Sequence, residues 1–178
     1  MAAPRHASKR HLYSAHNFGT VSSHNLGSRA IAAQRLTTTG VQMPRVHHQA
    51  AVVPYRIRNE RLEVALVTTS RGKGWIVPKG SVDHGERPRD AAIREAEEEA
   101  GLRGIVTRKP IGRYHHVKGN LHRQVDVYLM RVTSVLDYWL EDKLRRRRWM
   151  RIPDAAACVR EELQQFVHAI EGVVELDS

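Results

Sequence analysis

The stretch GSVDHGERPRDAAIREAEEEAGL spans residues 80–102 and places four glutamates between positions 95 and 99 of a strongly basic chain. Pro88 suits the first turn of a helix and Gly101 suits the position just past its end. The residues between them are good helix formers, so the stretch predicts a helix that carries the glutamate cluster.

Three of the glutamates, Glu95, Glu98 and Glu99, share one face of this helix, since each residue turns it by about 100°. Carboxylates at these spacings repel one another and destabilise a helix unless a cation lies among them. Oxygen ligands without nearby thiolates favour Mg²⁺ or Mn²⁺ over zinc. The alternative is a solvated face on which Arg94 or Arg89 pairs with the carboxylates, which is the usual meaning of an isolated glutamate run.

The spacing around the glutamates favours the metal site. Gly80 is followed by five residues and a glutamate, then by seven residues and Arg-Glu, a small apolar residue, any residue, Glu-Glu, any residue, glycine and an apolar residue. Every defining position of the Nudix box is matched over these 23 residues, which therefore resemble that box. The matched positions are Gly80, Glu86, Arg94, Glu95, Ala96, Glu98, Glu99, Gly101 and Leu102.

The resemblance implies an α/β/α sandwich, with a mixed sheet and the box helix packed against it, that hydrolyses a phosphoanhydride. It implies that Glu95, Glu98 and Glu99 are catalytic and hold Mg²⁺ or Mn²⁺ together with the Gly80 carbonyl. The residues expected to orient the motif are Glu86, Arg94 and Gly101.

The general base stays open between Glu95, Glu98 and an acid outside the box. Glu141 and Asp142, which precede the arginine run, are candidates of that kind, although exposed loop acids are usually inert. The adjacent histidines His115 and His116 call for the same caution.

The flanking segments, residues 68–80 and 132–155, resemble the diphosphoinositol polyphosphate and diadenosine polyphosphate hydrolase branch of the Nudix family. A phosphate-rich substrate suits a pocket of Arg, Lys and His side chains. By local match, the expected substrate-binding residues are Arg56, Thr69, Ser70, Arg71, Lys79, His122, Arg123, Arg145 and Arg147. The alternative for each of them is a solvated basic face.

The choice between the two substrate types stays open. Lys79 stands where inositol-type enzymes tend to carry successive glycines, so it looks more like the diadenosine polyphosphate side. Tyr114 and Tyr128, however, do not fall where an adenine-stacking tyrosine is expected.

The formal net charge is +10, and no Asp or Glu occurs in residues 1–59. Residues 1–42 show no sustained apolar period and predict a disordered basic extension. A start assigned too early, with Met43 as the alternative, or a targeting segment would have the same composition. Residues 43–178 are then one Nudix hydrolase domain, which we expect to be a monomer or a homodimer.

Cys158 is the single cysteine, so no internal disulfide can form, and no apolar run approaches the roughly 18 residues of a membrane span. These features predict a protein without a membrane partner in a reducing compartment, the cytoplasm rather than the mitochondrial matrix.

A coarse pattern of strands and helices follows from the apolar periods. Strands are predicted at residues 47–57, 62–70, 74–78, 104–117, 122–134 and 146–152, and further helices at 153–159 and 161–176. In the last helix, apolar residues recur at helical spacing and predict a face docked on the core.

A function of another class is RNA binding, since the run RRRR at residues 145–148 and the basic tail can grip a phosphate backbone. A hybrid of the two functions is hydrolysis at capped or triphosphorylated RNA 5′ ends. The intact set of box glutamates argues against a purely binding role.

Overall fold

The computed structural model describes residues 46–176, apart from the side chains of residue 118 and of residues 173–176. The predicted extension at residues 1–42 and the alternative start Met43 lie outside the described residues. Within the described part of the chain, no helix combines the length and the hydropathy that a membrane span requires.

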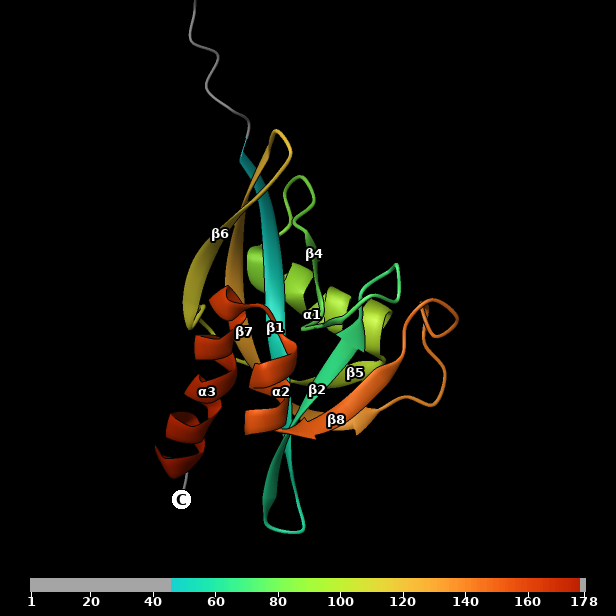
Figure 1. Cartoon of the computed structure of the whole chain (residues 1–178), viewed down its shortest axis with the longest axis vertical. Helices are drawn as coiled ribbons and strands as arrows, with labels where there is room; N and C mark the ends of the chain where they lie inside the picture. Colours follow the sequence, from blue (N-terminus) through green and yellow to red (C-terminus); the bar gives the residue numbers. More distant parts are fainter. Residues whose placement is uncertain (1–45, 177–178) are drawn as a thin grey trace, which may run out of the picture. The chain divides into compact units, whose positions relative to one another are not determined.

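An eight-stranded mixed sheet is the centre of the structure (Figure 1). Its main path runs β3–β2–β1–β7–β5, while β4 pairs with β1, β6 with β7 and β8 with β2. The long strands β1 and β7 run parallel, and the other strand pairs are antiparallel. The strands are β1 (Val46–Arg58), β2 (Arg61–Thr68), β3 (Trp75–Ile76), β4 (Lys79–Ser81), β5 (Leu102–Val106), β6 (Gly112–Lys118), β7 (Leu121–Val135) and β8 (Arg147–Arg151).

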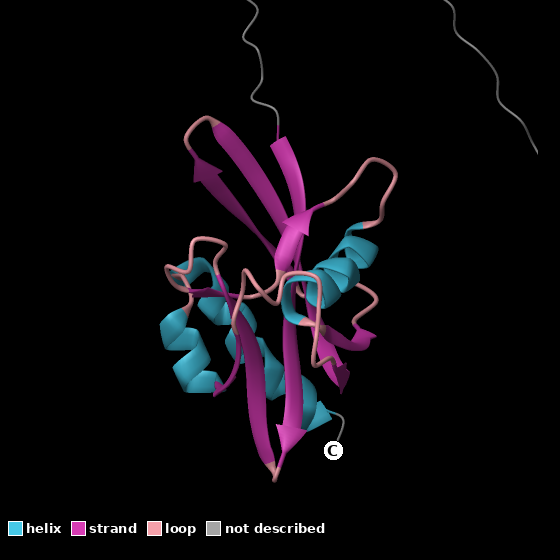
Figure 2. Ribbon diagram, turned by 90° about the vertical axis from the view of Figure 1, so that its right-hand side faces the viewer, coloured by secondary structure: helices cyan, strands magenta, loops and turns pink. Residues whose placement is uncertain are grey.

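Helices cover both faces of the sheet (Figure 2). On one face, α1 (Pro88–Ala100) packs its alanines against small and branched residues of β1 and β2. On the other, α2 (Ile152–Cys158) and α3 (Glu161–Leu176) complete a larger core, in which Leu163, Phe166 and Ile170 of α3 are buried. The expected α/β/α sandwich and the docked final helix are confirmed.

Two features of the sheet differ from the sequence-based expectation. The single strand predicted at residues 104–117 is two strands, β5 and β6, which pair with different halves of β7. The break contains Pro110, which has no N–H to donate to the ladder, while Thr107 and Ile111 on either side donate to carbonyls of β7. The three-residue strand β4 was not predicted, and it brings Lys79 and Gly80 beside β1.

Candidate active site

Helix α1 begins and ends where the sequence predicts. Pro88 occupies its first turn, and Gly101 caps its end with a left-handed backbone (φ 61°), donating its N–H to the carbonyls of Ala96 and Glu97. A Cβ at residue 101 would also press on the Trp139 side chain. This position therefore needs glycine for both conformation and space, as its expected structural role implies.

The backbone of β4 lies directly against the acidic face of α1. A Cβ built on Gly80 would overlap the Glu95 carboxylate, so only glycine lets the loop approach it this closely. Glu95 itself is buried, and burial raises the pKa of its carboxyl group, an effect that the adjacent Arg94 guanidinium opposes.

Arg94 joins the preceding loop to the helix. Its guanidinium donates to the Glu86 carboxylate at 3.1 Å and to the Ser81 carbonyl at 2.9 Å. It also contacts Glu95 at 2.8 Å and Glu98 at 3.0 Å. Glu86 in turn accepts the Asp83 N–H at 3.0 Å, so Arg94 and Glu86 link the loop to the helix.

Glu99 is the most buried acid of the helix face. Its carboxylate accepts the Lys79 N–H at 3.0 Å and forms an ion pair with Arg145, whose side chain is only 11% exposed. Burial raises the pKa of Glu99 to about 7, although the Lys79 hydrogen bond and Arg145 act in the opposite direction. A buried carboxyl group with a raised pKa, facing a cavity, is typical of functional sites.

The donor set of this face suits a hard divalent cation. The described residues contain no group of three His, Cys, Asp or Glu side chains already converged on one point. Arg94 and Arg145 instead neutralise the three carboxylates. The close approach of Gly80 to Glu95 places a backbone segment and carboxylate oxygens together, which is the ligand chemistry that Mg²⁺ and Mn²⁺ prefer.

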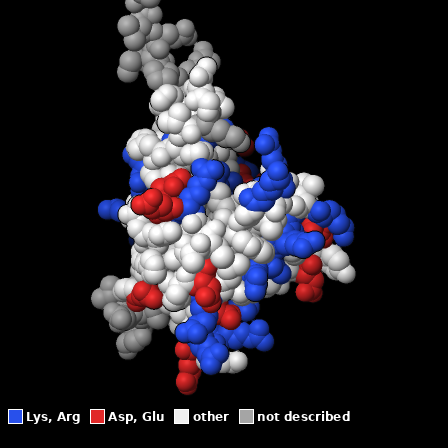
Figure 3. Space-filling model, viewed as in Figure 1, with Lys and Arg blue, Asp and Glu red and all other residues white. Residues whose placement is uncertain are grey.

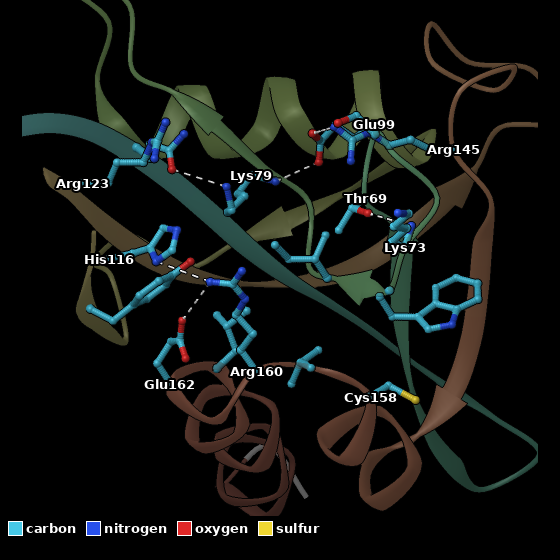
Figure 4. Close-up of a pocket in the computed structure, with 18 residues that line it drawn as sticks. Thr69, Lys73, Lys79, Glu99, His116, Arg123, Arg145, Cys158, Arg160 and Glu162 are labelled. Carbon is cyan, nitrogen blue, oxygen red and sulfur yellow. Dashed lines mark hydrogen bonds and ion pairs between the residues drawn. The ribbon is translucent and has the colours of Figure 1, made fainter. Parts of the chain in front are cut away.

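A cavity of about 520 Å³ opens beside Glu99 (Figure 4). It contains five of the predicted substrate-binding residues: Thr69, Ser70, Lys79, Arg123 and Arg145. Burial lowers the pKa of Lys79 and so does the nearby Arg123, whereas Glu99 raises it. Basic side chains gathered around one cavity suit a ligand with several negative charges.

The other four predicted substrate-binding residues do not line this cavity. Arg56 is paired with Glu63 at 2.8 Å and stacks on the Trp149 ring at 3.8 Å. Arg147 donates to the carbonyls of Gly101 at 3.2 Å and Leu136 at 3.1 Å, and lies over the Trp139 ring at 4.5 Å.

Arg71 is exposed in the turn after β2, and His122 is exposed near the start of β7. The contacts of Arg56 and Arg147 give both residues a structural role, whereas a substrate-binding role for Arg71 and His122 stays a prediction.

Several residues of the cavity were not predicted to bind substrate. All of them lie outside the box, two of them only a few residues before it: Gln49, Lys73, Trp75, His116, Arg160 and Glu162. Only the basic side chains among them carried a signal, as scattered charges. The convergence of His116, Arg160 and Glu162 depends on the pairing of β6 with β7 and on the α2–α3 connection, which no local pattern reveals.

The remaining candidates occupy different surroundings. Tyr114 lines the cavity and packs against Phe166, whereas Tyr128 is buried in the core beneath α1. Glu141 donates its N–H to the Glu98 carbonyl at 3.0 Å, and its carboxylate accepts from Arg145. Glu141 is therefore joined through Arg145 to Glu99.

The NUDIX domain family model matches residues 46–170, which include the whole box helix and the cavity. The chain belongs to the Nudix family. The family resemblance of residues 80–102 is therefore confirmed. Relatives of this chain are named as phosphohydrolases.

Among curated proteins, the chain is 39% identical to diphosphoinositol polyphosphate phosphohydrolase 3-beta of Bos taurus over 111 residues, covering 60% of this chain and 65% of that protein. It is 29% identical to Nudix hydrolase 4 of Arabidopsis thaliana over 154 residues, which cover 75% of this chain and 73% of that protein. The match to the bovine relative thus spans less than two thirds of that protein's length.

Solved structures share the Nudix fold. An Ap4A hydrolase of C. elegans, in a binary complex, superposes with a TM-score of 0.65 at 23% identity and covers 72% of this chain and 98% of its own. At 23% identity, this structural similarity establishes the fold of the present chain and nothing further.

Proposed function

We propose that this protein hydrolyses a phosphoanhydride bond in a small polyphosphorylated molecule, of the diphosphoinositol polyphosphate or diadenosine polyphosphate type. One observation carries the proposal. Glu99, on the acidic face of the box helix, lines the same cavity as Lys79, Arg123 and Arg145. A cation-binding face and a polyanion-binding pocket thus share one opening.

The proposed cofactor is Mg²⁺, which Mn²⁺ can replace. Glu95, Glu98 and Glu99 would hold it together with the Gly80 carbonyl. A divalent cation there would neutralise charge on phosphate oxygens and lower the pKa of a bound water.

The surrounding residues prepare the pocket for phosphate. Lys79 and Arg123 present positive charge to the cavity, and the Gln49 side chain accepts from the Lys79 ammonium group at 3.3 Å, which holds that lysine in place. Arg94 orients the β4 loop against α1. Arg145 offsets the charge of Glu99 until a cation does so.

Both substrate types have support. The bovine and other relatives are named for diphosphoinositol polyphosphates, whereas the C. elegans structure is of an Ap4A hydrolase. The cavity also has apolar walls, including Trp75, Ile76 and Leu163, which suit a ring as well as phosphates. Each substrate type therefore belongs in the same experiment.

RNA is the less favoured substrate because the arginine run does not form one patch. Arg145 is largely buried and Arg147 partly buried, and the protein engages both, whereas Arg146 and Arg148 are exposed. On the face in Figure 3, basic side chains lie in several separate groups, some of them beside acidic ones.

The test is a panel of phosphoanhydrides incubated with the protein and Mg²⁺. It contains diadenosine tetra- to hexaphosphates, diphosphoinositol phosphates, ADP-ribose, nucleoside triphosphates and 5′-triphosphorylated RNA. We expect turnover of one of the first two classes, reduced at least about 100-fold by Glu98→Gln and by Glu99→Gln. Full activity of both variants, or cleavage of none of the compounds, would refute the proposal.

A further inference from the structure

The cavity has a second group of charged side chains on the wall opposite the box helix. Arg160 lies in the connection between α2 and α3, and its guanidinium is 3.4 Å from Nδ1 of His116 on β6. Glu162, at the start of α3, is 3.8 Å from the same guanidinium. Figure 4 shows Arg160 pointing into the cavity from this wall, across from Lys79 and Glu99.

The pairing of β6 with β7 adds a third basic residue to this group. His116 and Arg123 lie directly opposite each other in the antiparallel register, so their side chains are neighbours on the same face of the sheet. Burial lowers the pKa of His116, and the positive charge of Arg160 and then of Arg123 and Lys79 lowers it further, against the opposing effect of Glu162. Arg160, Arg123 and Lys79 therefore create a positive potential around His116, and Glu162 is the acid that opposes it.

The fold makes little use of the Arg160 guanidinium. Its side chain is 65% exposed and, among the described residues, contacts two other cavity residues, His116 and Glu162. Arg147 differs, because backbone carbonyls at the end of α1 occupy its donors. A guanidinium has five N–H donors in a planar fork that fits phosphate oxygens, so Arg160 keeps donors for a ligand.

We propose that Arg160, His116 and Arg123 form a second anion subsite, which binds a phosphate group remote from the bond that is cleaved. The subsite selects ligands whose phosphates are separated widely enough to reach both walls of the cavity, in preference to short pyrophosphate compounds. This inference rests on the proposed function and names the residues that determine its specificity. Glu162 limits the affinity of the subsite, because it competes with phosphate for Arg160.

The test measures binding without metal, by calorimetry in EDTA, for two probes of different reach: inositol hexakisphosphate and inorganic pyrophosphate. Arg160→Gln is expected to weaken hexakisphosphate binding about tenfold and to change pyrophosphate binding less than about twofold. Glu162→Gln is expected to strengthen hexakisphosphate binding about threefold. Arg148→Gln is the matched control, since it removes one exposed arginine that does not line the cavity, and it leaves both affinities within about twofold.

Thermal unfolding of each variant checks that the fold is intact, and Arg160→Lys, which keeps the charge, retains part of the affinity. The subsite is refuted if the wild-type protein does not bind hexakisphosphate, if Arg160→Gln weakens both probes equally, or if Arg148→Gln has as large an effect. Selective weakening by Arg160→Gln in a protein that cleaves none of the panel compounds would support the subsite and refute the proposed function.

Discussion

Replacing Gly80 with alanine tests how closely β4 must approach the acidic face of α1. The new Cβ would overlap the carboxyl carbon and both oxygens of Glu95. Gly80 does not have a positive φ, so the backbone itself accepts alanine. Because the overlap involves only the end of a flexible side chain, the carboxylate moves aside and the fold survives.

The magnitude follows from what the displaced Glu95 loses. A strained rotamer and a weakened contact with Arg94, now 2.8 Å, together cost about 1–2 kcal/mol of unfolding free energy. Moving the Glu95 carboxylate out of the proposed metal site lowers the affinity for a metal ion more than it lowers the free energy of unfolding. We expect the affinity for Mn²⁺ to fall about 10- to 100-fold.

Calorimetric titration with Mn²⁺ and thermal unfolding measure the two effects separately. Gly85→Ala is the control, because Gly85 has a φ of +80° but open space around its Cβ position. It costs about 1 kcal/mol through backbone strain and leaves the Mn²⁺ affinity unchanged. In a Glu95→Gln background, Gly80→Ala has little further effect on affinity, since both changes act on one group. A folded Gly80→Ala protein with wild-type Mn²⁺ affinity would show that the Glu95 carboxylate does not hold the metal.

Three further predictions concern the arginine run, the acidic face and the N-terminal segment. Arg147→Gln lowers the unfolding free energy by about 2 kcal/mol, because the Gly101 and Leu136 carbonyls lose a charged donor; a raised KM with unchanged stability would instead place Arg147 at the substrate. Burial raises the pKa of Glu99 to about 7, so the ionisation of this group makes the metal-free protein less stable as pH rises from 4.5 through 7. Because Mg²⁺ binds the ionised carboxylate, we expect it to raise the melting temperature more at pH 8 than at pH 6. An equal or smaller rise at pH 8 contradicts this expectation. Deletion of residues 1–42 leaves turnover of the best panel substrate unchanged, because the described residues that line the cavity begin at Gln49, and a large loss would give that segment a catalytic role.

The box helix was predictable because its signals are local. A proline in the first turn, a glycine just past the end and glutamates spaced on one face each act within a few residues, and the structure has them as expected. The break between β5 and β6 was not predictable in the same way. Both segments have strand character, and only their pairing with separate halves of β7 shows that Pro110 ends one strand before the next begins.

The sign of the cavity's charge was predictable, but not which cations supply it. Arg145 lies just before β8 and pairs with Glu99 and Glu141, whereas the Trp139 ring and helix-end carbonyls engage Arg147 at the start of the strand. Arg160 carried no signal beyond that of a scattered positive charge. It reaches the cavity because the α2–α3 connection passes beside β6, a contact between segments 44 residues apart.

We propose that the acidic face of α1 holds a divalent cation for phosphoanhydride chemistry. An anomalous difference map from crystals soaked in Mn²⁺ would locate that cation. We expect a peak among the carboxylates of Glu95, Glu98 and Glu99 near the Gly80 carbonyl, with Arg145 drawn away from Glu99. A map without a peak at this face, with both arginines still paired to the glutamates, would contradict it.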